Sequence, residues 1–332
     1  MNKENILEVK NLKTYFPIRG GIFNRVINHV KAVNGVNFEL LKNETLGIVG
    51  ESGCGKSTLI KTIMRGVHAS EGKILFNNGN NKIDILELNK KELKSIRKNI
   101  QMIFQDPFSS LSPRMTVRNI IVEPLKINKN IKDNKKLDEI AINLLKDVGL
   151  NPKYLQRYPH AFSGGQRQRI GVARALSLKP KLLLADEPTS ALDVSVQSQL
   201  LNLLTKLKEK YELSMIFISH DLSVVEHISD RMAVMYVGNI VEIGDVKEIF
   251  NKPTHPYTRA LLSAVPIANP HKRNHKELLE GEVADPANLP SGCPFHPRCK
   301  YKKDICIHQK PDLKPLKSNE NKKVACHFAN EL

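Results

Sequence analysis

The chain has no tryptophan, and its 11 phenylalanines and 7 tyrosines make up only 5% of its 332 residues. Aromatic side chains on which bases stack are typical of proteins that bind single-stranded nucleic acid, so this composition argues against that class. No apolar run approaches the roughly 18 residues of a membrane-spanning helix. The opening residues, MNKENILEVKNLKTYF, also lack the apolar segment and small-residue cleavage site of a secretory signal. We therefore expect a cytoplasmic protein.

Acidic residues are few compared with basic ones: 34 against 51, which gives a net charge of +17. A positive charge of this size suits nucleic acid or an anionic membrane surface as a partner. The basic residues, however, form no compact tract and have few aromatic residues among them. We interpret them as spread over solvated faces and expect no nucleic-acid partner, while contact with a membrane surface stays open.

Strand-like and helical patterns alternate along most of the chain and predict an α/β fold with a mainly parallel sheet covered by helices. Residues 112–162 have helical patterns broken by prolines and predict a helical insertion. Residues 17–30, PIRGGIFNRVINHV, contain two glycines and are expected to be irregular. From about residue 253, apolar runs shorten and a separate small tail domain is expected. Strands are expected at residues 6–16, 36–41, 45–50, 99–105, 181–188 and 214–219, with a hairpin at 231–244.

A glycine-rich loop, GESGCGKST, stands between a predicted strand and a predicted helix. It fits the pattern G-x-x-x-x-G-K-[ST], in which backbone N–H groups surround phosphate oxygens. Lys56 would contact the β- and γ-phosphates, and Ser57 would offer its hydroxyl to Mg²⁺. Cys54 fills a spacer position and is interpreted as a small residue without redox chemistry. The predicted nucleotide-binding loop consists of Gly50, Glu51, Ser52, Gly53, Cys54, Gly55, Lys56, Ser57 and Thr58.

Polar side chains follow three other predicted strands. Asp186 and Glu187 end the apolar run LLLADE, where Asp186 can hold Mg²⁺ and Glu187 can polarise an attacking water. His220 follows SMIFIS, and Gln105 ends NIQMIFQ. Because ligands bind at the carboxyl ends of parallel strands, we expect His220 to contact the γ-phosphate and Gln105 to lie at the same phosphate and Mg²⁺.

Residues 162–176, FSGGQRQRIGVARAL, supply a second helix N-terminus that can receive an anion. One ATP does not need both this site and the glycine-rich loop of the same molecule. We therefore expect the second site to serve a nucleotide held by another subunit.

Several of these motifs resemble those of ABC ATPases over residues 6 to about 250. The stretch Ser163–Gly164–Gly165–Gln166 is similar to their signature motif, and SALD at residues 190–193 is similar to their D-loop. The resemblance implies that Gln105 is the Q-loop glutamine and His220 the switch histidine. It also implies that Phe16, with Tyr15 as the second choice, stacks on adenine.

Further motifs make the resemblance to one group of ABC ATPases more specific. QDPFSSLSPRMTV, PTHPYTRALLSAVP and GCPFHPRC are similar to the ATP-binding subunits of oligopeptide and dipeptide importers. This likeness implies an ATP hydrolase that energises peptide import from the cytoplasmic face of the membrane, as a peripheral protein. The implied partners are a sister ABC ATPase subunit, two transmembrane permeases and an extracytoplasmic solute-binding protein.

The resemblance also implies the domain division: an ABC ATPase domain over 1–252, with a helical subdomain at about 110–165, and a tail domain over 253–332. Two alternatives stay open. Nickel or another small solute is the alternative cargo, and a non-transport ABC ATPase of DNA repair or translation is the alternative class.

Cysteine is scarce, with five residues, yet four of them fall near the end of the chain. In a reduced compartment, stable disulfides are the least expected use. Four thiolates suit zinc, with His296, His308 or His327 as substitute ligands, or a [4Fe–4S] cluster, while free thiols are the third option. Their spacing lacks the C-x2–4-C knuckle of zinc ribbons. Similarity to peptide-importer ATPases with such a tail favours a structural [4Fe–4S] cluster over Zn²⁺. The four cysteines are Cys293, Cys299, Cys306 and Cys326.

Overall fold

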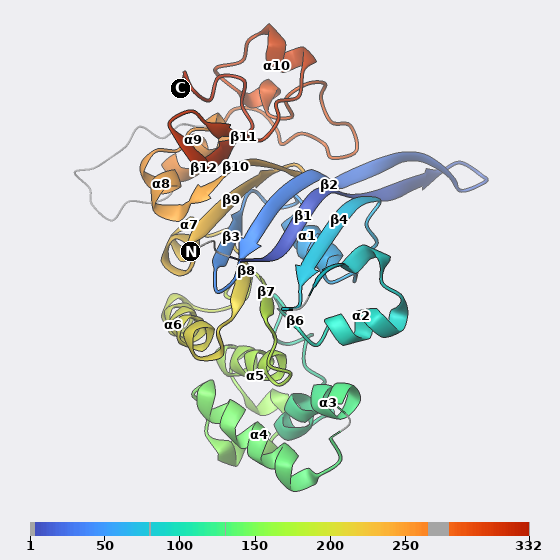
Figure 1. The fold of residues 1–332 in the computed structure, drawn as a ribbon, viewed down its shortest axis with the longest axis vertical. Coiled ribbons are helices and arrows are strands. Elements are labelled where there is room, and N and C mark those ends of the chain that lie inside the picture. Colours follow the sequence, from blue (N-terminus) through green and yellow to red (C-terminus); the bar gives the residue numbers. More distant parts are fainter. Residues whose placement is uncertain (1–3, 80, 130, 265–278, 332) are drawn as a thin grey trace. The chain divides into compact units, whose positions relative to one another are not determined.

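The computed structural model describes residues 4–79, 81–129, 131–264 and 279–331. The chain forms two compact units, whose elements are shown in Figure 1. The first unit comprises Met1–Leu7, Leu40–Thr45 and Phe76–Ser219. The second comprises Glu8–Glu39, Leu46–Leu75 and His220–Leu332.

Three parallel strands form the centre of the first unit. β7 (Leu182–Asp186) lies between β6 (Ile100–Ile103) and β8 (Ser214–Ile218). Every residue of β7 and β8 is buried, as expected for parallel strands whose two faces are both covered. Helix α5 (Gly164–Leu176) packs against β6 and against α6 (Val194–Tyr211). The predicted parallel arrangement is confirmed in this unit.

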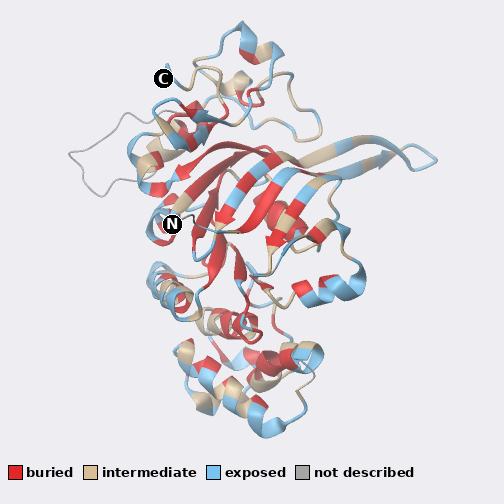
Figure 2. Cartoon of the chain, in the orientation of Figure 1, coloured by how far each residue is buried: buried red, intermediate tan, exposed pale blue. Residues whose placement is uncertain are grey.

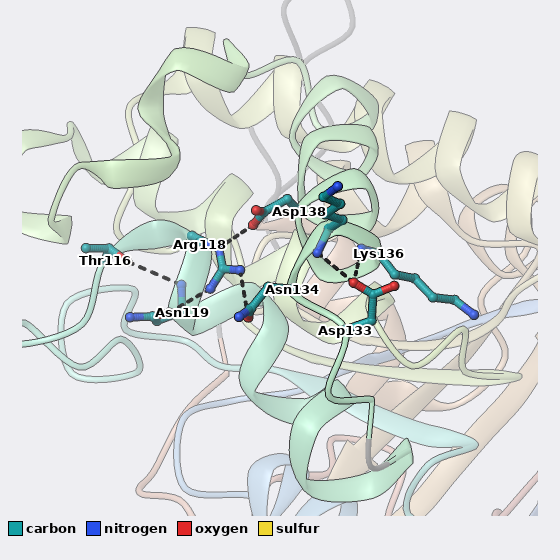
Figure 3. Close-up of polar contacts among 8 residues, drawn as sticks. Thr116, Arg118, Asn119, Asp133, Asn134, Lys136 and Asp138 are labelled. Atoms are coloured by element: carbon teal, nitrogen blue, oxygen red, sulfur yellow. Dashed lines mark hydrogen bonds and ion pairs between the residues drawn. The ribbon is translucent and has the colours of Figure 1, made fainter.

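The predicted helical insertion is also present in the first unit. It consists of α3 (Val117–Lys129), α4 (Asn134–Asp147) and two short 3-10 turns, Pro152–Gln156 and Pro159–Ala161. Figure 3 shows how α3 and α4 are joined: Arg118 forms an ion pair with Asp138. The Asp133 side chain caps α4 by accepting from the backbone N–H groups of its first turn. The same unit contains β5 (Lys82–Asp84), a 3-10 turn at Ile85–Glu87 and α2 (Lys90–Ile96).

The second unit contains strands from both halves of the chain. β3 (Thr45–Val49) runs parallel to β9 (Arg231–Tyr236), and β9 pairs antiparallel with β10 (Asn239–Asp245). β10 then pairs antiparallel with β12 (Asn319–Val324), which pairs with β11 (Lys314–Leu316). Strands from the tail therefore extend the sheet that contains β3. In Figure 2, buried residues are concentrated on β3 and β9.

A further sheet holds β2 (Arg25–Leu41), β1 (Asn5–Gly20) and β4 (Glu71–Asn77) side by side. The expectation of irregular structure at residues 17–30 was wrong, because β1 and β2 continue through them as a hairpin. The two glycines mark its turn: Gly21 has a φ of 72° and lies beyond the end of β1. The sheets are therefore mixed rather than mainly parallel.

Six short helical elements complete the described part of the second unit. They are α1 (Lys56–Ile63), α7 (Leu222–Ile228), α8 (Val246–Asn251), α9 (Pro256–Ser263), a 3-10 turn (His296–Arg298) and α10 (Asp304–His308). Among the described residues, no helix has the length and apolar character needed to cross a membrane.

A buried ion pair joins β12 to β10. Lys322 Nζ lies 3.1 Å from Glu242 Oε1, and the two side chains are 1% and 0% exposed. The carboxylate also accepts from the backbone N–H groups of Thr254 and His255, both at 2.9 Å, and the ammonium donates to the Lys252 carbonyl. The charges are thus surrounded by hydrogen-bonding partners, which is the condition under which a buried ion pair is tolerated.

Replacing Lys322 by methionine should destabilise the fold by about 3–5 kcal/mol, because it leaves the Glu242 carboxylate buried without its counter-charge. Lys323→Met is the matched control, since Lys323 is the next residue of β12 and is exposed. It should change the free energy of unfolding by less than about 0.5 kcal/mol. Urea unfolding of both variants measures the difference, and equal effects would contradict a structural role for the ion pair.

Candidate nucleotide site

The glycine-rich loop joins β3 to α1 and is enclosed by main-chain oxygens of other strands. A Cβ atom at Gly50 would lie 2.1 Å from the Met235 carbonyl oxygen, and one at Gly55 would lie 2.0 Å from that of Ala32. Both glycines also have positive φ angles, 153° and 104°. Only glycine fits these two positions, so the loop's curl is fixed by its surroundings as well as by its own sequence.

The start of α1 is suited to an anion. Its N-cap residue, Gly55, offers no side chain to the first backbone N–H groups of the helix, which are therefore able to bind phosphate oxygens. Ser52 and Gly53 lie exposed at the crest of the loop, while Ser57 and Thr58 are half-buried in the first turn of α1.

Lys56 is 5% exposed, and its ammonium points back into the loop. Nζ donates to the carbonyl oxygens of Gly50 at 2.7 Å and Glu51 at 3.0 Å. Cys54 is buried beneath it, with Sγ 3.8 Å from Nζ, and burial raises the pKa of this thiol. A buried thiol with a raised pKa is a poor nucleophile, so the loop places its positive charge, rather than its sulfur, where a phosphate would lie.

In the first unit, the predicted carboxylates end β7. Asp186 is 3% exposed, and Glu187 follows with a φ of 42°, which is unusual for a residue other than glycine. Three main-chain contacts hold Glu187 in this conformation. Its N–H donates to the Ile218 carbonyl of β8 at 3.1 Å, and its carbonyl accepts from the N–H and the hydroxyl of Ser190.

Gln105 and Glu187 are brought together although 82 residues separate them. Gln105 Nε2 donates to Glu187 Oε2 at 3.1 Å. The carboxylate is thereby oriented at the end of the sheet. The pairing brings the side chains that follow β6 and β7 together at one edge of the sheet. Their contacts with phosphate and Mg²⁺ stay predictions.

The signature-like residues begin α5. Ser163 is the N-cap: its Oγ accepts from the Gln166 N–H, and its N–H donates to Gln166 Oε1 at 3.1 Å. This is a capping box. Gly164 and Gly165 form the first turn, and a Cβ at Gly165 would lie 2.3 Å from Val196 Cγ1 of α6. Close packing of the two helices therefore requires glycine there.

The remaining predicted residues lie in the second unit. Phe16 is on β1 and is 40% exposed. The neighbouring Tyr15 is held in place, because its hydroxyl donates to Asn34 Oδ1 at 2.6 Å. His220 is exposed and stands between the end of β8 and the first turn of α7.

Two residues that the sequence did not point to hold the glycine-rich loop from the tail. The Glu51 N–H donates to the hydroxyl oxygen of Tyr257, on α9, at 3.0 Å. Arg298 donates to both carboxylate oxygens of Glu51, at 3.0 and 3.3 Å, with its own side chain 7% exposed. The motif GCPFHPRC contains Arg298, but nothing in its pattern indicates that its partner lies 247 residues earlier.

Tyr257 is itself fixed by a buried aromatic cluster. Its ring lies 4.7 Å from that of Tyr236 on β9 and 5.5 Å from that of Phe295, measured between centroids. His255 caps α9 through Nδ1, and burial lowers its pKa to about 3, so the ring is neutral and acts as an acceptor. The tail thus contacts the phosphate loop through a rigid core.

The four late cysteines surround one small pocket, which His296 and His327 also line. All four are free thiols. Burial, with a smaller contribution from the other three sulfurs, raises the pKa of Cys293 to about 11. Burial also raises the pKa of Cys299 and of Cys326. A metal ion would reverse this preference by stabilising the thiolates. The number and type of donors fit a metal, yet across the described part of the chain no three His, Cys, Asp or Glu side chains are arranged to hold one.

Tyr257→Phe should weaken ATP binding about 2- to 10-fold, because the Glu51 N–H loses its acceptor. Arg298→Gln should act in the same direction, since it releases the Glu51 side chain. Tyr154→Phe, on the 3-10 turn Pro152–Gln156 of the first unit, is the control and should leave the affinity unchanged. Equilibrium binding of a fluorescent ATP analogue gives the dissociation constants. Unchanged affinity in both test variants would show that the tail does not support the loop.

Residues 33–190 match the family described as ABC transporter, and residues 241–306 match the family described as oligopeptide/dipeptide transporter, C-terminal region. Among solved structures, the dimeric ATP-binding cassette MJ0796, in a post-hydrolysis state bound to ADP and Pi, is similar with a TM-score of 0.64. Its sequence identity is 28%, and the match covers 72% of this chain and 98% of that one.

Relatives extend over almost the whole chain. The oligopeptide transport ATP-binding protein AppF of Bacillus subtilis is 53% identical, over 98% of each chain. The oligopeptide transport ATP-binding protein OppF of Haemophilus influenzae is 49% identical, over 98% of this chain and 97% of its own length. The chain therefore belongs to the ABC transporter family, in the group of the oligopeptide and dipeptide transport ATP-binding proteins.

Proposed function

We propose that this chain is the ATP-binding and ATP-hydrolysing subunit that energises the import of oligopeptides or dipeptides through a membrane ABC transporter. One observation carries the proposal: the chain that contains the phosphate loop and the ABC signature also matches, at residues 241–306, the C-terminal region of oligopeptide/dipeptide transporters. The chain is an ATP hydrolase of the ABC class.

The phosphates of ATP would bind at the loop and the start of α1. Lys56 donates to two loop carbonyls, and phosphate oxygens would be stronger acceptors because they are charged. The exposed ring of Phe16 would stack on adenine. Ser57, Gln105 and Asp186 would hold Mg²⁺, which neutralises charge on the β- and γ-phosphates.

Glu187 would act as the general base toward the attacking water, and His220 would contact the γ-phosphate. The hydrogen bond from Gln105 to Glu187 supports this role, because it orients the carboxylate at the end of β7, and a carboxylate can accept the proton of an attacking water.

The signature residues would serve a nucleotide bound by the sister ATPase subunit. The Ser163 hydroxyl accepts a hydrogen bond within its capping box, and a hydroxyl can donate at the same time. Its O–H, together with the N–H groups of Gly164 and Gly165, would close over the partner's ATP, and Gln166 would contribute through its side-chain amide. Affinity that depends on the γ-phosphate would then favour the closed dimer and drive the permeases.

The proposed assembly contains a sister ABC ATPase subunit, two membrane permeases and an extracytoplasmic solute-binding protein, with this chain peripheral on the cytoplasmic face. The chain would consist of an ATPase domain over 1–252, with a helical subdomain at about 110–165, and a cysteine-containing tail domain over 253–332. The antiparallel pairing of β12 with β10 supports a tail that folds onto the sheet containing β10.

For the tail, we propose that Cys293, Cys299, Cys306 and Cys326 hold a [4Fe–4S] cluster, with Zn²⁺ as the alternative. Support comes from the four sulfurs around one pocket. The cluster's role would be structural. A bound cluster would also fix the segment that precedes Cys299. This segment includes Arg298, which donates to the Glu51 carboxylate of the glycine-rich loop.

Glu187→Gln should retain ATP binding but lower hydrolysis about 10²- to 10⁴-fold, because a carboxamide cannot accept the proton of the attacking water. Glu209→Gln, an exposed position on α6, is the matched control and should keep wild-type turnover. Phosphate release by the assembled transporter measures both. Near-wild-type turnover of Glu187→Gln would show that another group is the base.

The cargo is tested with the same two variants in proteoliposomes that contain the whole transporter. ATP-driven uptake of a labelled tripeptide should be lost with Glu187→Gln and kept with Glu209→Gln. Uptake of labelled nickel but not of the peptide would contradict peptide import while leaving the ATPase assignment intact.

Anaerobically purified protein should contain about four irons and about four acid-labile sulfides per chain, with the broad visible absorption of such clusters. Cys299→Ser should lose them, whereas Cys54→Ser should keep them, because Cys54 lies in the phosphate loop. A colourless protein with stoichiometric zinc would replace the cluster by the zinc alternative.

A further inference from the structure

The hairpin formed by β1 and β2 ends in a tip of exposed apolar side chains. Ile22 is 99% exposed, Phe23 79%, Ile27 68% and Val26 48%. Every residue from 21 to 27 is exposed, and Figure 2 shows the tip of the hairpin in the colour of exposed residues. Single exposed apolar residues are common on protein surfaces, but four within six positions mark an interaction site.

The tip is an ordered turn. The Asn24 N–H donates to the Gly21 carbonyl at 3.1 Å, and both residues have positive φ angles, 50° and 72°. Across the hairpin, a Cβ at Gly20 would lie 2.9 Å from Ile27 Cδ1, so the glycine makes room for that side chain. The conformation therefore presents Ile22 and Phe23 at its end.

The base of the hairpin is held by a segment of the tail. Asn28 Nδ2 donates to the Ala287 carbonyl at 2.9 Å and to Asn288 Oδ1 at 3.1 Å. The Lys31 N–H donates to the Pro286 carbonyl at 2.9 Å. These contacts stop at residue 28, so the hairpin is supported up to its apolar tip and not beyond.

The charge around the tip has one sign. No aspartate or glutamate occurs from residue 9 to residue 38. Arg19 and Arg25 flank Ile22 and Phe23 in the chain, His29 follows on β2, and all three are exposed. The Arg25 guanidinium lies 5.4 Å from the centre of the Phe23 ring. At a membrane interface, apolar side chains contact the acyl chains and cationic side chains contact the anionic headgroups. The tip carries both kinds of side chain.

The tip is apolar on both faces. Val26 and Ile27 are consecutive residues of β2, so their side chains point to opposite faces of the hairpin, and both are exposed. A flat protein surface would cover only one of these faces. A lipid interface surrounds an inserted tip and covers both.

We propose that the tip, Gly21–Ile27, inserts into the surface of an anionic phospholipid membrane, with Arg19 and Arg25 contacting lipid phosphates. This inference rests on the proposed function only in that a transporter subunit works beside a membrane. The hairpin would then contribute to membrane attachment independently of the permeases.

The absence of tryptophan gives a direct probe. Phe23→Trp places the chain's single tryptophan in the tip, and Ile127→Trp, at a 57% exposed position on α3, is the matched control. Mixed with vesicles of phosphatidylglycerol and phosphatidylcholine, the first variant should shift its emission to shorter wavelength, and the control should not. An unshifted Phe23→Trp spectrum would overturn insertion.

Flotation of the full wild-type chain with the same vesicles measures affinity. Ile22→Ser combined with Phe23→Ser should weaken binding at least about tenfold, as should vesicles of phosphatidylcholine alone, while Ile127→Ser should bind like wild type. ATP binding of the double variant should stay unchanged. Equal binding by the double variant, or equal binding to neutral vesicles, would overturn the proposal.

A permease is the other partner such a tip could meet. Loss of co-purification with the permeases in detergent by the double variant, with vesicle binding unchanged, would replace the lipid by a protein partner. Vesicle binding needs neither ATP hydrolysis nor peptide uptake. A failure of the transport assignment would therefore appear in the uptake assay and not in this one.

Discussion

The glycine-rich loop of this protein depends on a steric constraint: at two of its positions the main chain has no room for a Cβ atom. The Met235 carbonyl oxygen blocks Gly50 and the Ala32 carbonyl oxygen blocks Gly55. Because β9 and β2 approach the loop so closely, the loop must curl. The Lys56 side chain is then directed back across it. The loop's shape is thus set by β2, which precedes it, and by β9, which follows it much later in the chain.

The tail, the residues from about 253 onward, also helps to hold the glycine-rich loop. It reaches the loop through Tyr257 and Arg298, both bonded to Glu51. It is secured to β10 by the Lys322–Glu242 ion pair, whose charges are kept by a full set of hydrogen bonds. A change in the tail can therefore reach the phosphate loop through direct contacts. The four cysteines lie in the same segment, and Cys299 is adjacent to Arg298, which contacts the glycine-rich loop.

The β1–β2 hairpin shows a different use of the same tail. Residues 286–288 hold the base of the hairpin, and the tip beyond it is exposed. Sequence patterns failed here for a physical reason. Residues 17–30 have no alternation of apolar and polar side chains, because beyond the point where the tail supports the hairpin neither face is buried. Alternation arises only where one face of a strand packs on a core.

Local motifs determined much of the site. The glycine-rich loop between strand and helix, the acidic pair after an apolar run and the signature stretch each follow from short-range chemistry, and the parallel strands β6–β8 follow from their unbroken apolar runs. What the sequence could not determine are contacts between distant residues: the antiparallel pairing of β10 with β12, the hydrogen bond from Gln105 to Glu187 across 82 positions, and the ion pair of Arg298 with Glu51 across 247. Such long-range contacts depend on which surfaces meet when the chain folds, and a short-range sequence pattern does not specify those surfaces. The tertiary structure alone decided that the tail supports the phosphate loop, because a carboxylate and a guanidinium become partners only when packing brings them within hydrogen-bonding distance.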